Sequence, residues 1–104
     1  MSTRATYQFI TEFSDITCYI HHDGYPSGAC EYLAKGSNAA SFIRGNENAE
    51  ITRDHELHGD TEYRYTIRDG FLTASKYEFD GESGKWTGFY FGLLCDFIDE
   101  HRKD

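Results

Sequence analysis

The sequence has few of the features that mark secreted or membrane-bound proteins. It contains three cysteines, and neither their odd number nor their spacing fits a disulfide framework or a metal-binding motif. No apolar run approaches the ~20 residues of a membrane helix, and residues 1–6 lack an apolar signal core. We therefore expect a cytoplasmic protein in which Cys18, Cys30 and Cys95 are small buried apolar side chains.

Cationic residues are also scarce. The chain has 10 Lys and Arg against 18 Asp and Glu, a formal net charge of −8. Binding nucleic acid requires a cationic surface that displaces counterions, and docking on anionic lipid requires one too. The charge argues against both and is compatible with a protein partner that has a basic surface. The alternative is an acidic surface that only keeps a small protein soluble.

Aromatic residues, by contrast, are plentiful. They make up 16% of the 104 residues, enough apolar area to fill one core. A chain of this length fits a single domain, so we predict one α+β domain over residues 1–104.

Hydrophobic periodicity predicts the elements of that domain. Strands with alternating apolar residues are expected over residues 4–12, 16–22, 63–68, 71–79 and 85–90. Helical stripes follow Pro26 and Ser37, and another closes the chain, while residues 47–60 read as a polar loop, with one short strand or turn at residues 49–52 as an option. The order β-β-α-α-β-β-β-α predicts an antiparallel sheet of four to five strands, with two or three helices packed on one face.

Four of the five histidines lie in two short segments, residues 21–26 and 54–60. Histidine and carboxylate ligands suit zinc, manganese or iron, although no H-E-x-x-H motif is present. Residues 24–28, at a helix start, suggest a second option, an anion or nucleotide cradle that Arg44 approaches. The alternative to both involves no ligand: the histidines form hydrogen bonds that fix the loops, and residues 24–28 form a tight turn. The residues of this candidate ligand or metal site are His22, Asp23, Tyr25, Arg44, His55 and His58.

No nucleophile elbow and no Walker loop occurs, so the sequence favours a non-enzymatic protein without a cofactor. The strand aromatics allow two further interpretations beside a plain core: a sheet surface that stacks bases, or one that joins two copies in a homodimer. The residues concerned are Tyr63, Tyr65, Tyr77, Phe79, Trp86 and Tyr90.

Three segments, residues 4–9 (RATYQF), 19–29 (YIHHDGYPSGA) and 58–65 (HGDTEYRY), resemble small hypothetical proteins of phages, prophages and proteobacterial mobile elements. The resemblance spans most of the chain and is most specific at the HHDGYP turn. It implies a setting, a mobile genetic element, rather than an activity.

That setting implies a function class. Small acidic phage proteins often inhibit host defence, as anti-CRISPR or anti-restriction proteins do, by occupying a basic groove made for nucleic acid. Spaced carboxylates can substitute for phosphates there. We therefore expect a monomer or homodimer that contacts a host defence protein directly. The binding surface is predicted at Glu47, Glu50, Asp54, Glu56, Asp60 and Glu62, with Asp96, Asp99 and Glu100 as further acids on the last helix.

Overall fold

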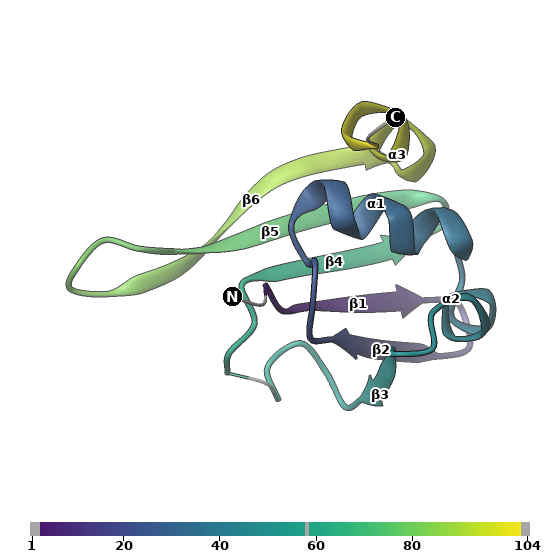
Figure 1. The fold of residues 1–104 in the computed structure, drawn as a ribbon, viewed down its shortest axis with the longest axis horizontal. Coiled ribbons are helices and arrows are strands. Elements are labelled where there is room, and N and C mark those ends of the chain that lie inside the picture. Colours follow the sequence, from purple (N-terminus) through teal and green to yellow (C-terminus); the bar gives the residue numbers. More distant parts are fainter. Residues whose placement is uncertain (1–2, 58, 103–104) are drawn as a thin grey trace.

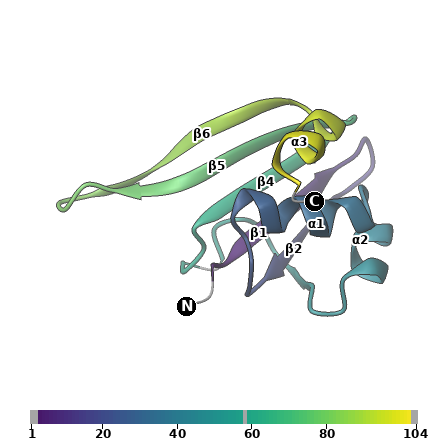
Figure 2. The same ribbon diagram turned by 45° about the horizontal axis from the view of Figure 1, so that its top comes forward.

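The chain forms one six-stranded sheet in the computed structural model, which describes residues 3–57 and 59–102 (Figure 1). The strands are β1 (Ala5–Ile10), β2 (Asp15–Ile20), β3 (Glu50–Thr52), β4 (Tyr63–Arg68), β5 (Phe71–Phe79) and β6 (Gly84–Leu93). The helices are α1 (Pro26–Lys35), α2 (Ala39–Gly45) and α3 (Leu94–His101). In space the strands run in the order β3-β2-β1-β4-β5-β6, and the helices lie on one face of the sheet (Figure 2).

The predicted α+β class and the helices on one face are confirmed, but the sheet differs from the prediction in two details. It has a sixth strand, because β3 pairs with β2 at the edge. It is also mixed, because β1 and β4 pair in parallel. Parallel neighbours need a long crossover, and the chain between the two hairpins provides it through α1 and α2. Within the described residues, no helix has both the length and the apolar character needed to cross a bilayer.

The helices cover one face of the sheet, which we call the helix face. Alternation along β1 determines which of its side chains are buried there. Tyr7 is fully buried there and stacks on Tyr65, with ring centroids 5.1 Å apart. Phe42 of α2 packs on the same ring at 5.0 Å. The predicted inward side of β1 is confirmed. Cys18 and Cys30 are buried as expected, but the expectation for Cys95 was wrong: α3 directs its neighbours to the sheet and leaves this thiol exposed.

Helix and turn boundaries follow local signals. Asn38, rather than Ser37, caps α2, since its side chain accepts from the Ser41 backbone N–H in a capping box. The hairpin between β4 and β5 turns at Asp69 and Gly70, both with positive φ (52° and 79°), as Asp-Gly turns require.

The β5–β6 hairpin extends beyond the rest of the sheet. Pairing of β4 with β5 stops at Tyr63–Lys76, whereas β5 and β6 stay paired to Phe79–Gly84. Residues 77–86 therefore form a two-stranded projection, visible on the left of Figure 1, which we call the arm. A register shift between Ala74 and Ser75 lies near its base, and such a bulge increases the local twist.

Candidate functional site

The HHDGYP segment is a tightly packed connection between β2 and α1. The Tyr65 hydroxyl donates to the buried Gly24 carbonyl at 2.6 Å, and the Gly24 N–H donates to the Thr3 carbonyl at 2.9 Å. The Tyr32 hydroxyl donates to the His22 carbonyl at 3.2 Å. These contacts satisfy backbone groups that the turn leaves unpaired. A structural role thus accounts for most of this distinctive segment.

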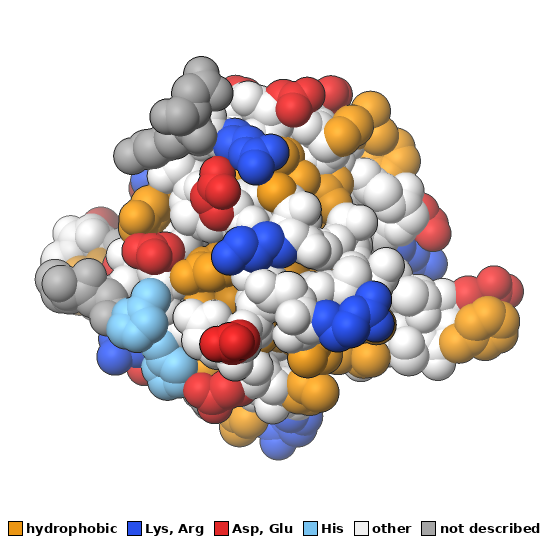
Figure 3. All heavy atoms as spheres, turned by 45° about the vertical axis from the view of Figure 1, so that its right-hand side comes forward, with side chains coloured by type: hydrophobic (Ala, Val, Ile, Leu, Met, Phe, Trp, Pro, Cys, Tyr) orange, Lys and Arg blue, Asp and Glu red, His pale blue; other side chains and the backbone are white. Residues whose placement is uncertain are grey.

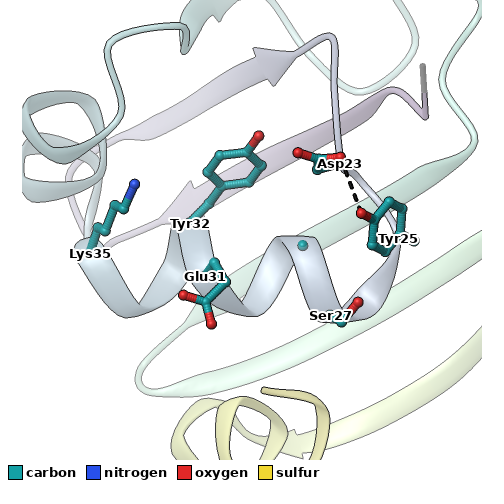
Figure 4. A pocket seen from close by; sticks show the side chains of 7 residues that line it. Asp23, Tyr25, Ser27, Glu31, Tyr32 and Lys35 are labelled. Atoms are coloured by element: carbon teal, nitrogen blue, oxygen red, sulfur yellow. Dashed lines mark hydrogen bonds between the residues drawn. The ribbon is translucent and has the colours of Figure 1, made fainter. Parts of the chain in front are cut away.

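A cavity of about 530 Å³ opens beside the turn on the solvent side of α1 (Figure 4). Two carboxylates, those of Asp23 and Glu31, line it, and the Tyr25 hydroxyl donates to Asp23 at 3.1 Å. Lys35 is the cation among the lining residues, and Arg44 is not one of them. The carboxylates of Asp23, before the helix, and Glu31, within it, repel a phosphate in this cavity, so the geometry does not support the anion cradle.

His55 fixes the segment between β3 and β4 onto the second face of the sheet, which we call the open face. Its Nδ1 lies 2.6 Å from the Thr6 hydroxyl, and its Nε2 lies 2.9 Å from the Thr66 hydroxyl. A neutral imidazole donates at one nitrogen and accepts at the other, and a hydroxyl can take either role. Burial, with the Arg64 charge beside it, lowers the pKa of His55 to about 4. His55 thus joins loop to sheet in its neutral form.

Acidification is expected to weaken this connection. The pKa of His55 is about 4 in the folded chain and about 6.5 in an unfolded one. Stability from the neutral ring is therefore complete above pH 6.5 and is lost as the pH falls towards 4. Allowing for partial exposure, we expect a loss of about 2 kcal/mol in the free energy of unfolding between pH 7 and pH 4.

Urea unfolding of wild type and His55→Gln at both pH values measures this effect. The glutamine variant lacks the titrating ring but keeps the carboxylates, which titrate in both proteins. Its stability should therefore fall by about 2 kcal/mol less than that of wild type over the same pH interval. If both proteins lose the same free energy of unfolding between pH 7 and pH 4, the stabilising role of neutral His55 is wrong.

The residues of the predicted ligand or metal site fall into separate parts of the structure. Asp23 and Tyr25 line the cavity on α1, whereas His55 belongs to the open face across the sheet. Arg44 lies in the last turn of α2, and His58 lies outside the described residues. Over residues 3–57 and 59–102 no group of three or more His, Cys, Asp or Glu could hold a metal. The arrangement of the described residues therefore does not support a metal site.

Three of the six predicted surface acids have an ion-pair partner within the chain. The pairs are Glu50–His21 (2.8 Å), Asp60–Arg4 (3.1 Å) and Asp54–Arg53 (2.9 Å). Asp60 also accepts from the Tyr19 hydroxyl at 2.9 Å, and Asp54 accepts from two backbone N–H groups of its own turn. These acids hold the loop, so their first role is structural.

The other three predicted acids are exposed. Glu47, Glu56 and Glu62 have no ion-pair partner in the described part of the chain. On the face shown in Figure 3, acidic and basic side chains are interspersed, and histidines gather at one margin. That face is therefore not a surface of a single sign, and the negative charge available to a partner is more local than the total suggests.

Hydrophobic side chains gather on the part of the open face that the loop leaves uncovered. We call this the open aromatic surface; its members, with exposed fractions, are Phe71 (46%), Tyr77 (45%), Phe79 (66%), Phe91 (77%) and Leu93 (44%). The rings of Phe71 and Phe91 stack across β5 and β6 at 6.2 Å. Tyr63 and Tyr65, from the same predicted aromatic set, pack on the core side instead. Of the predicted aromatic set, Tyr77 and Phe79 are thus the exposed members, while Phe13 and Tyr25 are exposed elsewhere on the described chain.

A smaller hollow lies where the loop meets the base of the arm. Its volume is about 270 Å³, and it is lined by Glu56, Gly59, Thr61, Arg64, Tyr77 and Trp86. The Arg64 guanidinium carbon lies 3.9 Å from the centre of the Trp86 ring, and Tyr77 meets that ring edge-on at 5.5 Å. At this distance the guanidinium lies over the indole ring in a cation–π contact.

Comparisons with protein-family models, with curated proteins and with solved structures found no match to this chain. Arguments about function therefore rest on the geometry above.

Two of these features were missed by the sequence reasoning. The arm had a usable signal, because β5 has 9 residues and β6 has 10, whereas β4, their neighbour, has 6. Strands longer than their neighbour must extend past it. The hollow had no such signal, because Glu56, Arg64 and Trp86 come from segments whose pairing only the fold defines.

Proposed function

We propose that this protein is a non-enzymatic binding protein that acts by contact with another protein. The open aromatic surface is the observation that carries the proposal, since it places five large hydrophobic side chains, each at least 44% exposed, on one side of the β5–β6 hairpin. Exposed apolar patches on small proteins commonly mark interaction sites. Aromatic side chains contribute large contact area at small entropic cost, and they dominate binding energy at interfaces.

For the partner we propose a host defence protein that handles nucleic acid and has a basic surface, as expected from the charge of −8 and the resemblance to phage proteins. Glu47, Glu56 and Glu62 are the acids that support this proposal, because they are exposed and unpaired among the described residues. Carboxylates on a rigid surface can occupy Arg and Lys side chains that otherwise bind phosphate. Such contacts would orient the partner, while the aromatic side chains provide affinity.

The experiment is a pull-down with tagged protein from lysates of bacteria that carry defence systems, followed by affinity measurement on the recovered effector. We expect Phe79→Ala and Phe91→Ala together to weaken binding at least about tenfold, since each removes an exposed aromatic group. Neutralising Glu47, Glu56 and Glu62 with glutamine should weaken it about tenfold at low salt and less at high salt.

A matched control removes three charges elsewhere, through Glu12→Gln, Asp15→Asn and Glu31→Gln, which are exposed positions outside the predicted binding acids. Equal loss of binding in both charge variants would show that only net charge matters. Recovery of no nucleic-acid-handling protein from any host would overturn the proposed partner. A dimer mass that both aromatic substitutions convert to a monomer would instead assign the surface to a second copy of the chain.

A further inference from the structure

Arg64, like Arg44, has no carboxylate partner among the described residues, but Arg64 is half-buried whereas Arg44 is exposed. Four others face a carboxylate, in the pairs Arg4–Asp60 (3.1 Å), Arg53–Asp54 (2.9 Å), Arg68–Asp69 (4.0 Å) and Arg102–Glu31 (3.4 Å). The Arg64 Nε is buried and has no hydrogen-bond partner among the described residues. A buried donor without an acceptor costs free energy, so the chain leaves the Arg64 guanidinium only partly satisfied, and its outer nitrogens are the ones that a ligand in the hollow would contact.

The guanidinium is held in place before any ligand arrives. One of its faces packs on Trp86, with 3.9 Å between guanidinium carbon and ring centre. Its strand is fixed on one side by β1 and on the other by β5. The loop that closes the hollow is fixed by His55, which bonds to Thr6 and Thr66. Such preorganisation lowers the entropic cost of binding.

The remaining walls define the chemistry of the occupant. Tyr77 and Trp86 provide apolar ring surface, and Thr61 and Glu56 provide polar groups in a volume of about 270 Å³. A guanidinium presents its N–H donors as a planar fork, which the two oxygens of a planar anion fit.

The charge of the hollow favours an anion of single charge. Glu56 lines the same space as Arg64, and the whole chain has a net charge of −8. Both repel a phosphate monoester, with a charge near −2, more strongly than a carboxylate. We infer that the hollow binds a small carboxylic acid with a planar apolar body, with Arg64 on the carboxylate and Tyr77 and Trp86 on the body.

The hollow shares Glu56 and Tyr77 with the proposed protein-binding surface, but its occupant is a free small molecule, so binding can be tested without a protein partner. Trp86, which lines the hollow, also provides a spectroscopic signal for ligand binding. Trp86 is the single tryptophan of the chain, so intrinsic fluorescence and the indole N–H resonance report on the hollow alone. Benzoate serves as the probe, with benzamide as its uncharged counterpart and phenyl phosphate as the doubly charged one.

Benzoate is expected to change the Trp86 signal saturably, and benzamide and phenyl phosphate to bind at least about tenfold more weakly. Arg64→Gln should weaken benzoate binding at least about tenfold, and Arg64→Lys should weaken it too, because lysine lacks the planar fork. Arg68→Gln is the matched control. Arg68 lies four residues after Arg64 on the same face of β4, and its variant should bind benzoate as wild type does. Glu56→Gln should reduce the preference for benzoate over phenyl phosphate.

Circular dichroism and thermal unfolding verify that each variant is folded before titration. Three results would overturn the inference: no saturable change with benzoate up to about 20 mM, equal binding of benzoate and benzamide, or undiminished binding in folded Arg64→Gln and Arg64→Lys. If the glutamine variant does not fold, the lysine variant and the benzamide comparison still decide the question.

Discussion

Replacing Gly28 with alanine is expected to destabilise the protein by about 3 kcal/mol or more, although helix propensity alone predicts the opposite sign. Gly28 is the third residue of α1, a position where alanine is normally better than glycine by about 1 kcal/mol. A Cβ there would lie 2.1 Å from the Asp23 carbonyl oxygen and 2.8 Å from the Asp23 Cβ. Either the helix or the turn must move, and both are packed against the core.

The turn has little freedom to relax around that methyl group. Asp23 already has a positive φ of 55°, a conformation that few residues other than glycine, asparagine and aspartate adopt. Its neighbour Gly24 is held by the Tyr65 hydroxyl and by the Thr3 carbonyl. Backbone contacts of this kind cannot be relieved by a rotamer change, so the destabilisation belongs with the larger single-residue effects.

Urea unfolding of Gly28→Ala, with Gly59→Ala as the matched control, measures the effect. A Cβ on Gly59 meets no atom within 4 Å, so that variant should stay within about 0.5 kcal/mol of wild type. If Gly28→Ala is as stable as wild type, the close packing of the HHDGYP turn against α1 is wrong.

Removing the Phe97 ring is expected to cost about 3–5 kcal/mol, as large-to-small aromatic substitutions in cores do. Phe97 is fully buried, and its ring lies 4.9 Å from that of Tyr90 and 6.0 Å from that of Tyr65. Its carbonyl also accepts from the Cys30 thiol at 3.4 Å. The ring thus fastens α3 to the sheet and to α1, and Phe97→Ala leaves a cavity between these three elements.

Phe91→Ala is the comparison that separates the core aromatics from the surface ones. Phe91 is 77% exposed, so its loss should change the free energy of unfolding by less than about 1 kcal/mol. For a domain of this size, 1 kcal/mol corresponds to roughly 4–8 °C in Tm. Thermal unfolding should therefore show a large drop for Phe97→Ala and a small one for Phe91→Ala. Similar drops would mean that Phe91 is buried and that the open aromatic surface is misplaced.

The histidine segments show how far residue-type reasoning reaches. The sequence also allowed a simpler interpretation, in which the histidines fix loops and the glycines form a tight turn. That interpretation describes His55 and Gly24 well, because both make hydrogen bonds that hold their segments in place. The predicted grouping of His55 with Asp23 and Tyr25 is not found in the structure, where they lie in separate places. It depended on which face of the sheet each segment meets, and a loop of polar residues has no periodicity that specifies a face.

The acidic residues illustrate a similar limit. Their number and exposure could be predicted from composition, since charged residues are rarely buried. Which of them are paired within the chain could not be predicted, because Arg4 and His21, the partners of Asp60 and Glu50, are distant in sequence and come close only through the pairing of β1 with β4 and of β2 with β3. Of the six acids predicted between residues 47 and 62, Glu47, Glu56 and Glu62 remain without an ion-pair partner in the described chain.

By itself, the sequence determined the class of the domain, the five longer strands, the helices and the inward side of β1, because period, turn chemistry and capping act between near neighbours. Tertiary structure decided the parallel pairing of β1 with β4, the face that the loop covers, the projection of the arm and the meeting of Arg64 with Trp86. These features depend on contacts between distant segments, whose free energies are fixed by the pairing of whole elements rather than by any local pattern.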